Sequence, residues 1–403
     1  MYIVKIINDG EITEILNDVE KLGSGTVVQG INTIDSFTFT IYPNNAGFDL
    51  LRDMVTIVRV ENASKGNRLD FLGRVLYTSL EMDSSGSISK TVTCESVMGF
   101  LHDSQQPYVE ESNWTVRNLL TLILANHNYY VEDFKQITLG TIEDPDKNVY
   151  CGIQRETSFK TIQDKLINAL GGELRIRLPS SGALCLDYVK QIGEAKNTKI
   201  ELSRNMKAIT RERDPSEVVT RLIPLGAKVS DDSEQRLSLL GHVGGDLTGD
   251  YDPTAKDYID NEAAIAQYGI RVGYQIWDDV TDVDNLRRKG EAWLAENTRV
   301  PVKYSITTLD LYLLGLDIDD FEVGNTHPIV NPLLGIEDTA RIIKKTINIL
   351  DETKNTIEIG DKFKTMSDIQ RDQKKESAAH SYSKSEIVSG VLDALPTWDG
   401  GSY

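Results

Sequence analysis

The stretch SFTFTIYPNNAGFDLLRDMVTIVRVEN, residues 36–62, decides the fold class. In residues 36–42 apolar side chains alternate with threonine and tyrosine, which is typical of a strand that buries one face. Pro43 and the two asparagines after it predict a turn, and residues 55–60 alternate again. Working outward, residues 71–80 and 87–95 predict two strands of a hairpin. Four or more such strands predict a small antiparallel barrel or sandwich.

Composition sets the limits for the rest of the chain. Its 403 residues, 40% apolar and 26% charged, predict two to four globular domains. No apolar run is long enough for a membrane span, and MYIVKIINDGEI at the start does not resemble a signal peptide. Three distant cysteines, Cys94, Cys151 and Cys185, disfavour a disulfide framework and fit a reducing cytoplasm.

The formal net charge of −19 disfavours a protein that coats DNA, because such a protein needs clustered lysine and arginine. It is compatible with a surface or channel that repels DNA. It is also compatible with a charge that only keeps the chain soluble, and on charge alone this simpler interpretation is preferred.

The pattern divides the chain into five parts. Residues 1–102 form the first β domain. Residues 103–200 predict an α+β domain, in which Ser112 or Asn113 caps one helix and Thr157 or Ser158 opens the next. Gly171 and Gly172 end that second helix, and a hairpin follows. A second β domain takes residues 201–230 and 301–365, a helical insertion 231–300, and a polar tail 366–403.

Three segments in order resemble one family. Residues 34–103 come first, NMKAITRERDPSEVVTRLIPLGAK (205–228) second, and IDNEAAIAQYGIRVGYQIWDDVTDVDNLRRKGEAWL (259–294) third. Together they resemble the hub region of the prophage tail endopeptidase, or tail-associated lysin, family. The resemblance covers most of the chain up to about residue 365.

The resemblance implies a β-rich α+β protein, folded like the baseplate hubs of contractile phages. It would hold two small antiparallel, tail-tube-like β-barrels, an α+β domain between them and the helical insertion. Three copies would supply six barrels, match a six-fold tail tube and close its distal end around a channel for DNA ejection. Implied partners are a distal tail protein, a tape measure protein and tip fibre or spike proteins that serve host attachment. The resemblance implies a place in the virion tail tip after synthesis in the host cytoplasm, without sequence-specific nucleic-acid binding or membrane insertion.

Two regions of the sequence also echo each other. A strand at 54–60 precedes the hairpin FLGRVLYTSLEMDSSGSISKTVTCES, and a strand at 321–330 precedes the hairpin ARIIKKTINILDETKNTIEIG. Their connectors differ in length, so the echo is weak alone. It predicts two related barrels per chain, against the alternative of one irregular β domain with a chance echo.

The sequence offers little catalytic chemistry, and we predict no catalytic, metal-binding or cofactor-binding residues and no cofactor. The five histidines are isolated: His102, His127, His242, His327 and His380. No paired metal-ligand spacing, G-x-S-x-G motif or phosphate-binding loop occurs. The cysteines are interpreted as buried and inert.

Other candidate sites are weaker. Asp246, Asp250 and Asp252 lack the spacing of an EF-hand, so a solvated loop is preferred over a calcium site. Trp277 and Trp293 are candidates for sugar stacking, with core packing preferred for Trp293 and interaction for Trp398 near the end. The acidic run at 277–284 suits a helix N-terminus.

Two further functions stay open beside the non-enzymatic hub. Some longer relatives that this chain resembles carry a peptidase, which is expected beyond the hub region, so a cell-wall hydrolase is one alternative. Only about 35 low-complexity residues follow the hub here, too few for a catalytic domain. The other alternative is a receptor module that binds carbohydrate. We expect the hub.

Overall fold

The computed structural model describes residues 1–143, 149–179, 182–216, 218–228, 235–240, 256–277, 280–309, 311 and 319–361. The polar tail expected at 366–403 lies outside these residues.

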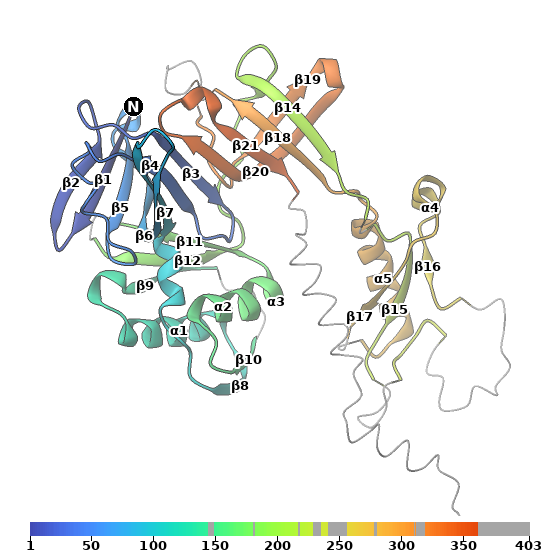
Figure 1. The fold of residues 1–403 in the computed structure, drawn as a ribbon. Coiled ribbons are helices and arrows are strands. Elements are labelled where there is room, and N and C mark those ends of the chain that lie inside the picture. The colour runs from blue at the N-terminus through green and yellow to red at the C-terminus, as the bar shows by residue number, and fades with distance from the viewer. Residues whose placement is uncertain are drawn as a thin grey trace, which may run out of the picture. The chain divides into compact units, whose positions relative to one another are not determined.

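A thirteen-stranded sheet dominates the described part of the chain (Figure 1). Its first half contains β1 (Tyr2–Asn8), β2 (Glu11–Leu16), β3 (Ser24–Gly30), β4 (Ser36–Ile41), β5 (Ile57–Asn62), β6 (Arg68–Met82) and β7 (Ile88–Ser96). Its second half contains β13 (Ile200–Glu201), β14 (Met206–Arg213), β18 (Val302–Thr308), β19 (Thr326–Asn331), β20 (Ile336–Asn348) and β21 (Thr356–Gly360). The order is β14-β18-β21-β20-β3-β4-β7-β6-β5-β1-β2, and β19 pairs with β20 and with β13. The predicted β-rich class is thereby confirmed.

The alternation in β4 creates the first core. Phe37, Phe39 and Ile41 are fully buried, and the two phenylalanine rings stack 5.0 Å apart. Val92 and Cys94 of β7 pair with them across the strands. A second core forms around residues of the later strands: Ile200, Met206, Tyr304, Ile306, Phe321, Ile329, Ile336, Ile342, Ile357 and Ile359.

The two halves of the sheet meet where β20 pairs antiparallel with β3. Ile347 lies opposite Val27, and neither side chain has any exposed surface. Ile347 and Ile349 belong to the core of the first half, although they come from the second. Segments more than 300 residues apart in sequence therefore share one sheet and one core, which no sequence pattern had indicated.

The α+β part lies between these halves in sequence. Its elements are β8 (Val109–Trp114), α1 (Val116–Tyr130), β9 (Ile137–Ile142), β10 (Val149–Ile153), α2 (Ser158–Ile162), a π-helical turn (Gln163–Ile167), α3 (Asn168–Leu170), β11 (Glu173–Arg177) and β12 (Leu184–Val189). Thr115 caps α1, because Ser112 and Asn113 lie within β8 instead. Thr157 caps α2 as predicted, and α3 ends at Gly171, whose φ of 81° favours glycine.

The predicted insertion contains β16 (Ile259–Asp260), α4 (Glu262–Tyr268), β17 (Val272–Ile276) and α5 (Val283–Asn297), and β15 (Arg221–Leu225) precedes it, within residues predicted for the second β domain. Asp282 caps α5 by accepting from the Asn285 amide, as its position in the acidic run suggested. β15 pairs with β16 and β17, so it joins the insertion's sheet and not the large sheet.

Short 3₁₀ turns complete the described structure: η1 (Ala63–Lys65), η2 (Val97–His102), η3 (Asp133–Lys135), η6 (Pro332–Leu334) and η7 (Glu352–Lys354). None of the helices in the described ranges is long and apolar enough to cross a membrane.

Replacing Ile347 by alanine should lower the free energy of unfolding by about 2–5 kcal/mol, because it leaves a cavity where the halves meet. Leu350→Ala is the control: Leu350 is 44% exposed just after β20 and should cost less than about 1 kcal/mol. Denaturant unfolding of both variants checks this. Equal losses would contradict a packed junction.

Candidate functional site

The three histidines within the described ranges have structural partners. His127 is buried, with Nδ1 2.7 Å from the Ser104 hydroxyl and Nε2 3.2 Å from the Lys135 carbonyl. His327 is buried against Phe321, with Nδ1 2.9 Å from the Thr198 carbonyl. Burial lowers the pKa of both imidazoles, so both are held neutral. His102 is exposed and lies against the Phe159 ring.

Neither described cysteine side chain is arranged as a nucleophile. Cys94 is fully buried in the first core, and burial raises the pKa of its thiol. Cys185 is partly exposed, with its Sγ 3.1 Å from the Thr138 hydroxyl. The expectation of a buried, inert thiol therefore describes Cys94; the side chain of Cys151 lies outside the described residues.

Several predicted candidates also fall outside the described residues: Asp246, Asp250, Asp252, His242, His380 and Trp398. Within the described ranges, no group of three or more histidine, cysteine and acidic side chains is placed to hold a metal ion. Trp277 packs against the insertion's small core, and Trp293 is partly buried.

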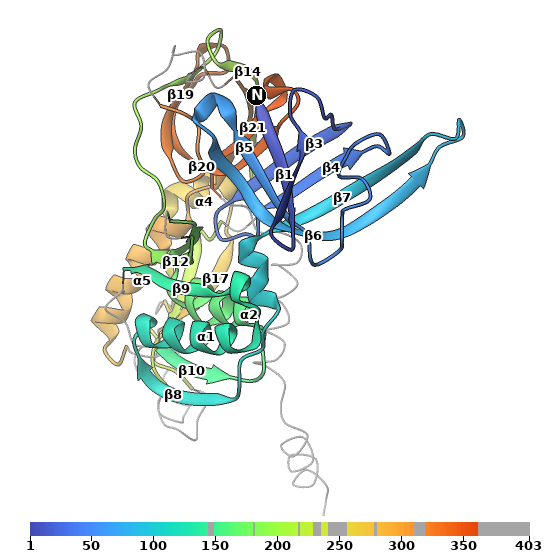
Figure 2. The same ribbon diagram turned by 90° about the vertical axis from the view of Figure 1, so that its left-hand side faces the viewer.

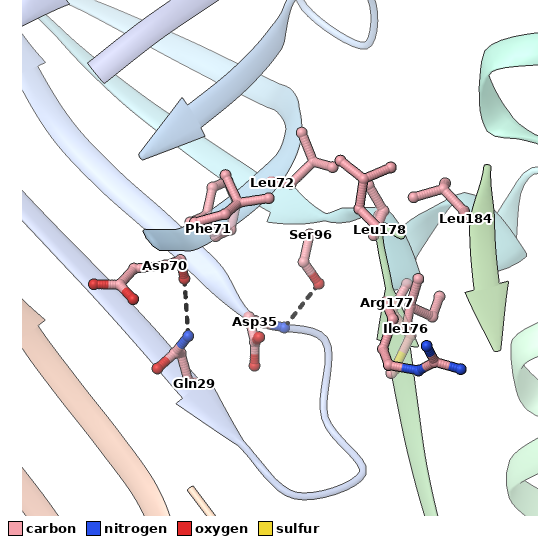
Figure 3. Close-up of a pocket in the computed structure, with 13 residues that line it drawn as sticks. Gln29, Asp35, Asp70, Phe71, Leu72, Ser96, Ile176, Arg177, Leu178 and Leu184 are labelled. Carbon is pink, nitrogen blue, oxygen red and sulfur yellow. Dashed lines mark hydrogen bonds between the residues drawn. The ribbon is translucent and has the colours of Figure 1, made fainter. Parts of the chain in front are cut away.

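A cavity of about 180 Å³ lies between the first half of the large sheet and β11 and β12 (Figure 3). Asp35 forms part of its wall. The Asp35 carboxylate accepts from the Gly30 amide at 3.0 Å. The main-chain amide of Asp35 donates to the Ser96 hydroxyl at 3.1 Å. Burial raises the pKa of Asp35 to about 7, which the Gly30 hydrogen bond offsets only in part.

The cavity's other polar side chains each have at least one partner, although the Asp70 Oδ2 atom is buried without one. The Gln29 side chain donates to the Asp70 carbonyl at 2.8 Å, and the Asp70 carboxylate accepts from Arg68 at 2.8 Å. Arg177 is bound to Asp187 on β12. Figure 3 shows the Asp35 and Asp70 carboxylates pointing in different directions. No histidine or cysteine lines this cavity; the Asp35 acid shares it with the Ser96 hydroxyl, which accepts from the Asp35 amide.

Charged side chains bridge the two halves of the sheet close to this cavity. Asp320 accepts from Lys65 of η1 at 3.0 Å and from Arg68 of β6 at 2.5 Å. Glu322 also pairs with Arg68. Burial alone would raise the pKa of the Asp320 carboxyl, but Lys65 and Arg68 outweigh it and hold the pKa at about 2. These ion pairs add polar contacts to the apolar β3–β20 junction.

The two halves of the sheet repeat one strand order. Along the chain, β3, β4, β5, η1, β6 and β7 are followed later by β14, β18, β19, η6, β20 and β21. The neighbours within the sheet are β3-β4-β7-β6-β5 in the first set and β14-β18-β21-β20-β19 in the second. The insertion follows β14, where the first set has only the short turn after β3. The predicted echo between hairpins is thus part of a longer repeat.

The connecting turns of the two sets also match in detail. Asn62 caps η1 and Asn331 caps η6, each through a side chain that accepts from a main-chain amide two or three residues later. Gly66 and Gly335 end these turns in the left-handed conformation, with φ of 66° and 61°. Such agreement in caps and pairing favours a true internal repeat over chance.

Sequence comparison locates the family signal in the second half of the chain. Residues 194–370 match the family described as prophage endopeptidase tail. The predicted family resemblance is confirmed. No curated protein matches the chain in sequence.

Solved structures show the same fold over nearly the whole chain. A prophage tail protein, gp18, from Listeria monocytogenes aligns with 93% of this chain and 98% of its own, at TM-score 0.55 and 14% identity. A tail protein from Neisseria meningitidis covers 89% and 96%, at 0.54 and 15%. The 43 kDa tail protein of prophage MuSo2 from Shewanella oneidensis covers 89% and 98%, at 0.56 and 13%. At these identities, the likeness establishes the fold.

Replacing Asp35 by asparagine should stabilise the protein at pH 7.5 but have little effect at pH 4.5. The pKa of Asp35 is about 7 in the folded state and near 4 in the unfolded state. Its contribution to wild-type stability is therefore complete below about pH 4 and is lost as the pH rises from about 4 to about 7. Asparagine keeps an acceptor for the Gly30 amide and does not ionise.

The difference in unfolding free energy between variant and wild type should grow by roughly 2–4 kcal/mol over this range. Thermal unfolding at both pH values measures it, with Asp49→Asn, at an exposed site, as control. A difference that does not change with pH would show that Asp35 ionises normally.

Proposed function

We propose that this protein is a structural hub of a phage or prophage tail, placed at the distal end of the tail tube. The observation that carries the proposal is the repeated strand order, with the two sets joined edge to edge through β3 and β20. The match of residues 194–370 and the fold shared with prophage tail proteins support it.

In this proposal each repeat is a small, tail-tube-like β-barrel, and three copies form a ring of six. A tube with six-fold symmetry then meets a trimer without a change in the number of contact sites. Joining sheets edge to edge also covers strands that would otherwise invite aggregation. The ring leaves a central channel for DNA, and the net charge of −19 favours passage without adhesion.

The proposed place at the distal end of the tail tube also determines the partners of the ring. The ring contacts a distal tail protein and a tape measure protein, and it carries tip fibres or spikes used in host attachment. These contacts are made in the virion, after the chain has folded in the host cytoplasm. Sequence-specific nucleic-acid binding and membrane insertion are not part of the proposal.

A cell-wall endopeptidase is the second candidate, because the matched family's description names that activity. The described histidines and cysteines do not form a nucleophile and base pair, since His127 and His327 are bound to other partners. We therefore propose a non-enzymatic role for this chain.

Purified protein should assemble into trimers as its concentration rises. Multi-angle light scattering from micromolar to millimolar chain concentration measures the molar mass, with multiples of 45.0 kDa expected and three copies as the limit. A stable dimer, or a monomer at every concentration, would contradict the ring.

Peptidoglycan should remain intact after incubation with the full chain, because the described serine–histidine contact, Ser104 with His127, is buried away from any substrate. Release of soluble fragments from purified cell walls measures cleavage, with lysozyme as positive control. Reproducible release that a single substitution abolishes would establish an enzyme instead.

A further inference from the structure

The β6–β7 ribbon extends beyond the rest of its sheet, and its outer part lacks a partner on one edge (Figure 2). β5 pairs with β6 only from Arg68 to Arg74, whereas β7 pairs with β6 as far as Met82. Among the described residues, no strand pairs with the β5 side of residues 77–82. Leu80 is 66% exposed and Met82 71% exposed on this segment.

The internal repeat shows what the equivalent segment of β20 does. One edge of β20 pairs with β21. The other edge pairs with β19 along its first part and with β3 along its second part. β6 has β5 beside its first part, and the place that β3 takes on β20 is empty among the described strands. Each chain therefore has two equivalent strand edges, on β20 and on β6. The edge on β20 is paired with β3, and the edge on the outer half of β6 has no described partner.

A bulge in β20 and a bulge in β6 show which residues of the two strands correspond. The β20–β21 pairing skips Ile343, and the β6–β7 pairing skips Leu76. Counting from these bulges, Leu80 corresponds to Ile347 and Met82 to Ile349. Ile347 is 0% exposed and Ile349 5%, because both enter the core beyond β3. Leu80 and Met82 occupy the equivalent positions on β6, but no described core covers them there.

The complementary edge is β14, which corresponds to β3 in the strand order. It pairs with β18 on one side, and its other side has no described strand. The register can be followed across each repeat, from β14 through β18 to β21 and from β3 through β4 to β7. On this basis Arg211 corresponds to Val27 and Glu212 to Val28. Val27 is fully buried at the β3–β20 junction, whereas Arg211 is exposed.

We propose that β14 of one copy pairs antiparallel with the outer half of β6 in a second copy, and repeats the β3–β20 junction between chains. Leu80 then lies opposite Arg211, Ser79 opposite Glu212, and Met82 beside Ile209. Leu80 and Met82 gain the core of the neighbour's second repeat. The occupant is a second copy of this chain because only the repeat itself supplies both matching edges. The proposal rests on the ring proposed above and specifies its contact.

Charge favours the same pairing. β14 carries Lys207, Arg211 and Arg213 with a single acid, Glu212, while the end of the β6–β7 ribbon carries Glu81 and Asp83. The net positive charge of β14 attracts the acidic ribbon end at long range, whereas two β14 edges would repel each other; the register places no opposite charges directly across from each other. A β6–β14 contact is therefore favoured over a symmetric β14–β14 contact.

Paired cysteines test the register directly. Ser79→Cys combined with Glu212→Cys should form disulfide-linked species of two and three chains under mild oxidation. The matched control is Val28→Cys with Thr346→Cys, the equivalent pair at the β3–β20 junction, which should form a disulfide within one chain. The four single variants control for native thiols. Non-reducing electrophoresis, combined with light scattering of the same samples, reads the outcome.

The outcomes separate the contact from the ring. Covalent trimers support both, and open chains of other lengths support the contact but contradict a ring of three. Trimers that form without the 79–212 disulfide, while the control pair links, overturn the contact and leave the ring standing. Monomers without any link between chains overturn both.

A surface substitution gives an independent test. Leu80→Lys, which places a like charge opposite Arg211, should leave the thermal stability of dilute monomer unchanged, because Leu80 is exposed in the single chain. It should weaken association by about tenfold or more, because a buried leucine is replaced by a charge. Val19→Lys, at an apolar site before β3 that is exposed to 81%, is the matched control. Unchanged association of the Leu80 variant would overturn the proposal.

Discussion

The pairing of β20 with β3 is the interaction on which the rest of the structure depends. It joins residues 344–348 to residues 26–30 and places Ile347 inside a core formed by the other end of the chain. The large loop closed by this contact costs entropy, which the buried isoleucines and the strand hydrogen bonds must offset. Without it, the two sets of strands would be separate sheets with exposed edges.

Buried charges supplement this contact. Lys65 and Arg68 hold Asp320 at the junction, and Arg74 holds the α+β part against the first half. Arg74 is 1% exposed and donates to both Glu95 and Asp103. Ion pairs of this kind stabilise little relative to apolar residues, but losing one partner leaves a buried charge and is costly. They therefore restrict how the parts can be arranged.

Much of the local structure could be predicted from the sequence. The alternation around Phe37 and Phe39 indicates the buried strand correctly, Thr157 is one of the two residues predicted to open α2, and the acidic run 277–284 precedes α5 as expected. These features depend on a few neighbouring residues, so local patterns carry the information. The choice of Ser112 or Asn113 as a cap was wrong because β8 pairs with β10 and extends the strand to Trp114.

Long-range features could not be predicted in the same way. Nothing in the periodicity of residues 344–348 distinguishes a strand that pairs within its own repeat from one that also pairs with β3. Asp35 precedes an alternating strand as many exposed aspartates do, and only its tertiary surroundings bury it. β15 looks like a strand of the large sheet until its pairing with β17 is known. Sequence reasoning thus detected the repeat weakly and missed the junction that joins its two copies.

A cryo-electron microscopy map of the assembled protein tests the central claim most directly, because it traces the sheet from one copy into the next. The account predicts six repeats in one closed ring, where β3–β20 junctions within chains alternate with β14–β6 junctions between chains. A ring whose copies meet through other surfaces, with β14 and the outer half of β6 both exposed, would contradict it.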